Sequence, residues 1–259
     1  MFSKKLKPIF ISKKNLMRIG PKKDGGYVID KRIINKIDHL IVCGVHDDWS
    51  FENQFLKLNN KTLLNAYDHS VNSYFWKKRF LKDMIEFFLL KKTTIHKIVN
   101  IFKYIDYLFF FRGKNKHYKL KISSKNIKNK EISINNVLKN KKNILLKIDI
   151  EGDEYKILKN IKKNSNKINC LIIEFHFIKQ KLKKIYDFVD KVKNLKIIHI
   201  HANNVAGLDK YGFPLAIEIT FVNSDLIKTT KKRNLRSYPI FEIDYPSVNR
   251  RNDIKLSFK

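Results

Sequence analysis

The chain has 259 residues, of which 43% are hydrophobic and 12% aromatic, so it can bury a large core and is neither disordered nor collagen-like. Its length suits one large α/β domain better than two. It contains no run of about 18 apolar residues, and no apolar stretch follows the basic N-terminus, so we expect a cytoplasmic protein without a spanning helix or a cleaved secretory signal.

The charge is strongly positive, with 55 Lys and Arg against 24 Asp and Glu and a formal net charge of +31. Such a surface attracts phosphates, anionic lipid or nucleic acid. However, only eight of the 55 are Arg, and Lys is spread nearly evenly, as in the proteins of AT-rich genomes. Because nucleic-acid sites usually bind through clustered Arg, we do not expect nucleic acid as the main partner.

Short β-branched apolar runs alternate with Lys-rich segments of helical spacing, which is typical of βαβ units in a mostly parallel sheet. The pattern predicts strands near residues 39–44, 62–67, 117–123, 143–149, 169–175, 195–201 and 215–222. It predicts helices around 51–59, 73–91, 94–111, 133–140, 153–163 and 179–193. Seven strands fit one doubly wound α/β domain.

Three regions surround or interrupt this alternation. Residues 1–36 contain turn residues such as Gly20-Pro21, and we interpret them as an N-terminal cap before the main domain at 37–225. Residues 226–259 form a C-terminal extension. A basic, aromatic helical insertion spans 80–112.

The insertion at 80–112 has two interpretations. Apolar residues at helical spacing are usually core, so the pattern favours a helical pair packed on the sheet or a contact between subunits of an oligomer. The alternative is a helix on an anionic membrane, with its aromatic residues inserted and its Lys toward the headgroups. That alternative would place the protein at the inner face of the membrane.

Polar residues follow several of the predicted strands. In open parallel sheets, ligands bind outside the carboxyl ends of the strands, so these residues are the candidates for binding and chemistry. They are Gly44 and His46 after the first strand, Asp68 and His69 after the second, Asp149 after the fourth, Glu174 and His176 at the end of the fifth, and His199, His201 and Asn203 in and after the sixth.

The first two strand ends indicate a nucleoside cofactor. Gly44 lets the backbone approach a ligand closely, and Asp68, about 24 residues later, is placed to accept both hydroxyls of a ribose. The three glycines of a pyrophosphate-binding turn are absent, and His46 stands where a second glycine is expected. A nucleoside without pyrophosphate fits this pattern better.

Residues 145–154, Leu-Leu-Lys-Ile-Asp-Ile-Glu-Gly-Asp-Glu, resemble the Lys-Ile-Asp-x-Glu-Gly-x-Glu signature of FkbM-type methyltransferases that depend on S-adenosylmethionine. Further segments resemble other motifs of this family in order along the chain. They are residues 24–28, 44–52, 67–70, 133–138 and 199–204. The resemblance spans roughly residues 17–222, and the ordered combination is more specific than any single motif.

The resemblance implies a Rossmann-like class I methyltransferase sheet of six parallel strands and a reversed seventh, with helices on both faces. It implies S-adenosylmethionine as cofactor, with Gly44, His46, Asp68 and His69 as contacts. Asp149 would lie beside both the sulfonium and the acceptor. The methyl acceptor is usually a hydroxyl, often on a sugar.

Methyl transfer to a neutral hydroxyl needs a general base. Asp149, Glu174, His176 and His201 are the catalytic candidates, and we favour His176 or His201 as the base. The rival use of these groups is a divalent metal such as Mg²⁺, Mn²⁺ or Zn²⁺, which would lower the pKa of the acceptor oxygen.

For the metal, the ligands would be Asp149, His176 and Asn203, by analogy with catechol-type O-methyltransferases of the same fold class. We expect a small-molecule or glycan acceptor, and the net charge favours one that is phosphorylated or nucleotide-linked. The alternatives are an RNA methyltransferase or RNA-binding protein, and a non-catalytic protein that contacts the membrane through 80–112.

Overall fold

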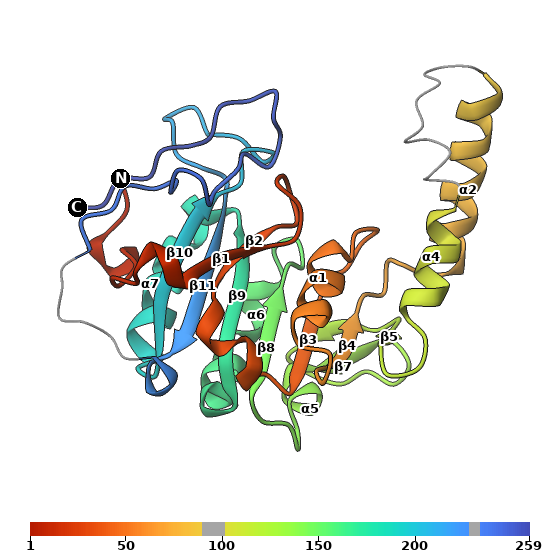
Figure 1. The fold of residues 1–259 in the computed structure, drawn as a ribbon, viewed down its shortest axis with the longest axis horizontal. Helices are drawn as coiled ribbons and strands as arrows, with labels where there is room; N and C mark the ends of the chain where they lie inside the picture. Colours follow the sequence, from red (N-terminus) through yellow and green to blue (C-terminus); the bar gives the residue numbers. More distant parts are fainter. Residues whose placement is uncertain (90–101, 228–233) are drawn as a thin grey trace.

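The computed structural model describes residues 1–89, 102–227 and 234–259, and its centre is a seven-stranded sheet (Figure 1). The strands are β3 (His39–Cys43), β4 (Leu63–Tyr67), β5 (Lys116–Tyr118), β8 (Ile144–Ile148), β9 (Ile168–His176), β10 (Leu195–Ala202) and β11 (Ala216–Asn223). Their order is β10-β11-β9-β8-β3-β4-β5. All neighbours are parallel except those of β11, which is antiparallel to both β9 and β10. The predicted class I methyltransferase sheet is confirmed.

Helices cover both faces of the sheet. The α-helices of the described residues are α1 (Ser50–Leu58), α2 (Ser73–Phe88), α4 (Lys103–Phe110), α5 (Ile134–Val137), α6 (Glu154–Lys163) and α7 (Ile178–Lys191), of which α2 and α4 stand away from the sheet (Figure 1). Helix α6 packs against α5 on one side and α7 on the other, while α1 lies on the opposite face (Figure 1). The predicted helix at 94–111 is described only from residue 102 onward, and residues 90 and 91 of the predicted helix at 73–91 also lie outside the described residues.

One predicted strand divides in two. Residues 116–118 join the main sheet, whereas β6 (Lys121–Ser123) pairs in parallel with β7 (Glu131–Ser133) in a separate two-stranded sheet. A tight turn, in which the amide of Leu120 donates to the carbonyl of Tyr118 at 2.8 Å, separates the two halves. A continuous β-type pattern concealed this turn because neither Gly nor Pro marks it.

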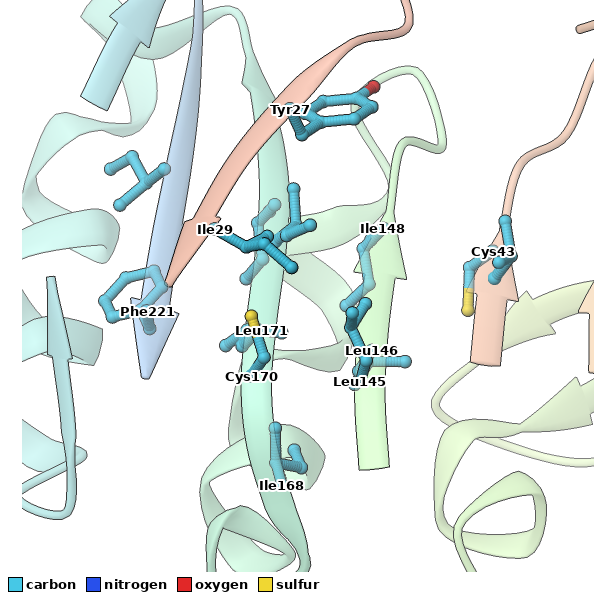
Figure 2. Packing of buried hydrophobic residues seen from close by; sticks show 14 of the residues in the cluster. Tyr27, Ile29, Cys43, Leu145, Leu146, Ile148, Ile168, Cys170, Leu171 and Phe221 are labelled. Carbon is cyan, nitrogen blue, oxygen red and sulfur yellow. The ribbon is translucent and has the colours of Figure 1, made fainter. Parts of the chain in front are cut away.

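The N-terminal cap forms an antiparallel hairpin of β1 (Leu16–Ile19) and β2 (Tyr27–Asp30), which the sequence pattern missed. All four residues of β2 are buried, because the strand crosses over β10 and β11 on the face that α1 also covers. Figure 2 shows Ile29 of β2 above the buried side chains of the sheet. These strands are four residues long, too short for alternation to reveal them.

The chain termini lie side by side and close one edge of the molecule (Figure 1). Phe2 donates from its amide to Ser257 and accepts from Lys259, both at 2.8 Å. The side chain of Asn234 donates to the carbonyl of Pro8 at 2.8 Å. The C-terminal extension is therefore packed against the N-terminal cap. No helix among the described residues is long and apolar enough to cross a bilayer.

The core contains a buried pair of a lysine and a glutamate. Lys147 Nζ lies 2.9 Å from Glu52 Oε1, with side-chain exposures of 6% and 0%, and it also lies over the rings of Tyr27 and Phe51 at 5.2 and 5.5 Å. Burial acts to lower the pKa of Lys147, but the carboxylate of Glu52 outweighs it and holds that pKa above its usual value. The pair therefore stays charged and links β8 to α1.

Glu52→Gln should lower the free energy of unfolding by about 3–5 kcal/mol, because it leaves the Lys147 ammonium buried without a compensating charge. The double variant Glu52→Met with Lys147→Met removes both charges and should recover most of that loss. Urea unfolding followed by circular dichroism measures both. A loss under about 1 kcal/mol for Glu52→Gln would show that the pair behaves as a solvated one.

Candidate active site

A cavity of about 770 Å³ lies at the carboxyl ends of β3, β4 and β8. All five residues predicted to contact a cofactor line it, together with parts of the N-terminal cap and of β6. Its lining includes Asp24, Gly25, Tyr27, Gly44, His46, Asp47, Tyr67, Asp68, His69, Leu120, Ile122, Lys147 and Asp149. This volume is in the range of about 300–1,000 Å³ that is usual for small-molecule sites.

Gly44 allows two strand-end loops to touch. Its φ is +86°, and a Cβ at this position would lie 1.7 Å from the carbonyl oxygen of Asp149. The amide of Asp149 also donates to the carbonyl of Cys43 at 2.8 Å. Only glycine satisfies both the left-handed backbone and the close approach, so Gly44 sets the distance between the loops after β3 and β8.

His46 adopts the backbone conformation that a glycine would favour. Its φ is +50°, in the left-handed region that histidine visits more often than most residues. The side chain is 72% exposed, and its Nδ1 lies 2.8 Å from Asp47 Oδ1. That hydrogen bond outweighs burial and raises the pKa of His46. The turn therefore keeps its geometry although the second glycine is absent.

Asp68 organises this turn with both carboxylate oxygens. Oδ2 accepts from the amides of Val45 and His46 at 3.0 and 2.9 Å. Oδ1 accepts from the amide and the hydroxyl of Ser70 at 2.8 and 2.6 Å. Burial acts to raise the pKa of Asp68, but these four bonds outweigh it and lower the pKa. Asp68 is thus an ionised support of the loop, and its contact with a ribose stays a prediction.

Asp47 joins the same loop to the helical insertion. Its carboxylate pairs with Arg79 of α2 and lies 3.6 Å from Lys103 Nζ of α4. The hydrogen bond from His46 is the main cause that holds the pKa of Asp47 well below its usual value. Helices α2 and α4 are therefore attached by charge to a wall of the cavity.

The opposite wall is apolar and aromatic. Tyr67 and Tyr118 stack with ring centroids 4.9 Å apart and an interplanar angle of 13°. Leu120 and Ile122 follow them along the cavity lining. A flat aromatic ring of a ligand can lie against such a surface.

Asp149 sits at the edge of the cavity beside His176, which comes from the end of β9. The His176 ring is surrounded by carboxylates: Nε2 lies 3.8 Å from Asp149 Oδ1, 3.5 Å from Glu151 and 3.6 Å from Glu174, and Nδ1 lies 3.4 Å from Glu154. Burial acts to lower the pKa of His176, but these acids raise it overall. The acids therefore favour the charged form of His176, which suits a positioning role better than that of a base.

The electrostatics at Asp149 favour proton acceptance. Burial raises the pKa of Asp149, and the positive charges of Lys147 and His176 oppose that rise only in part. Its Oδ1 accepts no hydrogen bond from the described residues. The Asp149 side chain is 32% exposed and lines the cavity, and a carboxylate with a raised pKa is a stronger base than an ordinary aspartate.

A row of ionisable groups crosses the neighbouring strands. Glu174, Glu218 and His201 are register partners on β9, β11 and β10. Glu174 accepts from the amide nitrogen of Asn203 at 2.8 Å. Burial and then the nearby Asp149 raise the pKa of Glu174 well above its usual value. Burial therefore favours the neutral form of Glu174, which does not line the cavity.

The structure contradicts the prediction that His201 is a base. The side chain is only 1% exposed, Nε2 lies 3.0 Å from Asp253 and Nδ1 3.4 Å from Glu218. Burial acts to lower its pKa, but the two acids raise the pKa of His201 to about 10. A buried imidazole that is already protonated cannot accept a proton, and the ring does not reach the cavity.

Two of the three predicted metal ligands, Asp149 and His176, come together. With Glu151 they form a group of described residues whose ligand atoms lie within 4.8 Å of one another. The Asn203 oxygen accepts from the amide of Val205 at 2.8 Å, and its nitrogen donates to Glu174 at 2.8 Å. Asn203 as a ligand stays a prediction. A divalent ion here stays a prediction.

Sequence reasoning missed three residues of the cavity wall. Asp24 and Tyr27 come from the N-terminal cap, and Lys147 precedes Asp149 by two residues on β8. The cap motif was visible, but its place over the sheet depends on the hairpin. Lys147 was also visible as a charge inside an apolar strand, which indicates a buried partner or a ligand.

Residues 96–196 match the family model for the methyltransferase FkbM domain. The matched segment contains Asp149, Glu174 and His176, the residues that meet at the ends of β8 and β9. The match covers about two fifths of the chain, so it shows that this segment is similar to the FkbM methyltransferase domain. The strand order agrees with the sheet that the resemblance implied.

Three solved structures resemble the fold at low identity. The fibrillarin pre-rRNA processing protein of Methanococcus jannaschii has a TM-score of 0.36 and 7% identity, covering 83% of this chain and 87% of that chain. Precorrin-6y C5,15-methyltransferase of Geobacter metallireducens has a TM-score of 0.37 and 8% identity, covering 83% of this chain and 98% of that chain. TYW2 of M. jannaschii, in complex with AdoMet, has a TM-score of 0.35 and 11% identity, covering 83% of this chain and 89% of that chain. At TM-scores below 0.5, these likenesses carry no argument about this chain. No curated protein matches the sequence.

The charge of His201 should make stability depend on pH. Since the pKa is about 6.5 in the unfolded chain and about 10 in the folded protein, folding takes up a proton between these values. The resulting stability is fully present below about pH 6.5 and is lost as the pH rises through about 10. The difference in unfolding free energy between the wild type and His201→Gln should therefore shrink between about pH 6.5 and 9.5. Chemical denaturation at several pH values tests this, and a constant difference would mean that His201 is neutral.

Proposed function

We propose that the protein is an S-adenosylmethionine-dependent O-methyltransferase that acts on a hydroxyl of a sugar or glycan precursor. The observation that carries this proposal is the position of Asp149. Its carboxylate has a raised pKa and is partly exposed, and it lies on the cavity wall next to the glycine turn after β3.

The residues of the cavity fit the cofactor. The turn at Gly44 and His46, the stacked Tyr67 and the apolar Leu120 and Ile122 offer a close backbone approach and a flat wall for an adenine. S-adenosylmethionine, when bound, supplies a methyl group that is already activated on a sulfonium. The protein's own task is then to orient the acceptor, exclude water and accept a proton.

Asp149 is the residue that we assign to the proton. It accepts the proton of the acceptor hydroxyl at its partly exposed carboxylate, and the raised pKa makes that transfer more favourable. His176, held in its charged form by the surrounding acids, keeps the Asp149 carboxylate oriented and offsets its negative charge. We therefore propose His176 as a positioning residue.

The acceptor end of the cavity suits a polyhydroxyl molecule. Asp24 at the rim, the Tyr27 hydroxyl and Asp149 can exchange several hydrogen bonds with sugar hydroxyls. Lys23 and Lys121 also line the cavity, and their charges favour a precursor that carries a phosphate or a linked nucleotide. This pattern supports the sugar precursor over RNA, since no Arg lines the cavity among the described residues.

The test is methyl transfer from methyl-labelled S-adenosylmethionine to a panel of free, phosphorylated and nucleotide-linked sugars, with RNA as a separate arm. We expect a labelled ether on a sugar hydroxyl. Asp149→Asn should lower kcat at least about a hundredfold, because it removes the base. It should change the Kd of the cofactor by less than about threefold.

The matched control is Asp190→Asn, a surface change on α7 that should leave kcat unaltered. If the methyl group is transferred to RNA but to none of the sugars, the sugar acceptor is wrong and the protein is an RNA methyltransferase. Full activity of Asp149→Asn on a sugar would exclude the proposed base while leaving the reaction in place.

A further inference from the structure

Helices α2 and α4 form an arm that stands away from the sheet (Figure 1). We call residues 73–89 and 102–110 the helical arm. Its base is packed: Trp49 contacts the rings of Trp76, Tyr107 and Phe110, with centroids 5.9 to 6.4 Å apart. The sequence favoured a helical pair packed on the sheet or an oligomer contact. The helical pair is packed against the rest of the molecule only at this base, because the remainder of the arm projects into solvent.

The outer face of the arm is apolar. On α2, Tyr74, Leu81, Ile85 and Leu89 recur at the spacing of one helix face, and their exposures range from 48% to 73%. Trp76 and the other buried side chains of α2 lie on the opposite face. Helix α4 and the residue before it add a second set of exposed apolar side chains. These are Phe102, Tyr104, Ile105, Leu108 and Phe109.

This clustering is uneven across the molecule. About half of the large apolar side chains that are exposed among the described residues belong to the helical arm, although the arm is a small part of the chain. Single exposed apolar residues are normal, whereas a contiguous apolar surface usually contacts a partner. The arm therefore has a face that some partner covers.

Charge identifies the partner. Lys77, Lys78 and Lys82 are all exposed and flank the apolar face of α2. The chain as a whole has a formal charge of +31, so a second copy of it would be repelled. An anionic lipid surface fits both sets of side chains. Its lipid chains can bury the aromatic and aliphatic side chains, and its headgroups carry the negative charge that attracts the Lys ammonium groups.

We infer that the helical arm docks the protein on an anionic membrane surface, with its apolar face inserted among the lipid chains and its flanking Lys among the headgroups. The attachment of Asp47 to Arg79 and Lys103 fixes the arm to the cavity loop. Docking would therefore hold the active site near the membrane, where lipid-linked precursors are presented. The docking itself does not rest on the proposed methylation.

The experiment is sedimentation of the full chain with vesicles of phosphatidylcholine alone, or with about one third phosphatidylglycerol. We expect binding to the anionic vesicles and little to the neutral ones. Leu81→Ser with Ile85→Ser and Leu108→Ser should weaken the binding at least about tenfold. The matched control carries Tyr211→Ser, Leu235→Ser and Phe241→Ser, three apolar residues outside the arm that are more exposed than those changed in it, and should bind like the wild type.

A second pair of variants tests whether the Lys residues of the helical arm bind the membrane more strongly than Lys residues elsewhere, at equal net charge of the protein. Lys77→Glu, Lys78→Glu and Lys82→Glu should weaken binding several-fold more than Lys183→Glu, Lys184→Glu and Lys193→Glu, which change the net charge equally on the far side of the molecule. Equal losses in the two charge variants would overturn the inference, as would equal binding of the arm variant and the wild type. Sedimentation velocity without lipid supplies a further outcome: if the wild type is a dimer and the arm variant a monomer, a second copy covers the face and the inference is wrong.

Discussion

The contact between the loops after β3 and β8 is the constraint on which the site depends. A side chain at Gly44 would overlap the carbonyl of Asp149, so this glycine fixes how closely the two loops approach. Asp68 then holds the turn from the other side through four hydrogen bonds. Because one carboxylate supports the turn, His46 can stand where a glycine is expected, and the cavity keeps a defined wall.

A second constraint is the excess of carboxylates on the adjoining strands. Glu174 and Glu218 face each other on β9 and β11, and neither could be buried as an isolated charge. The structure resolves this by burying Glu174, which raises its pKa and favours its neutral form, and by placing His176 and His201 beside the remaining acids. These acids raise the pKa of both histidines, which supports Asp149 as the proposed base.

The sheet and the strand-end residues could be predicted because both signals are local. Gly44, Asp68 and Asp149 each follow an apolar run directly, so their convergence required only parallel strands. The state of His201 could not be predicted, because its partner Asp253 arrives from a segment about 50 residues further along the chain. The cap hairpin and the projection of the helical arm depend on tertiary contacts in the same way.

The most direct test of the site is calorimetric titration with S-adenosylmethionine and S-adenosylhomocysteine. The wild type should bind both at one site per chain. Asp68→Asn should weaken both at least about tenfold, because an amide nitrogen cannot accept the hydrogen bonds that hold the turn. No binding by the wild type, or equal affinity in the variant, would contradict the assignment of this cavity to the cofactor.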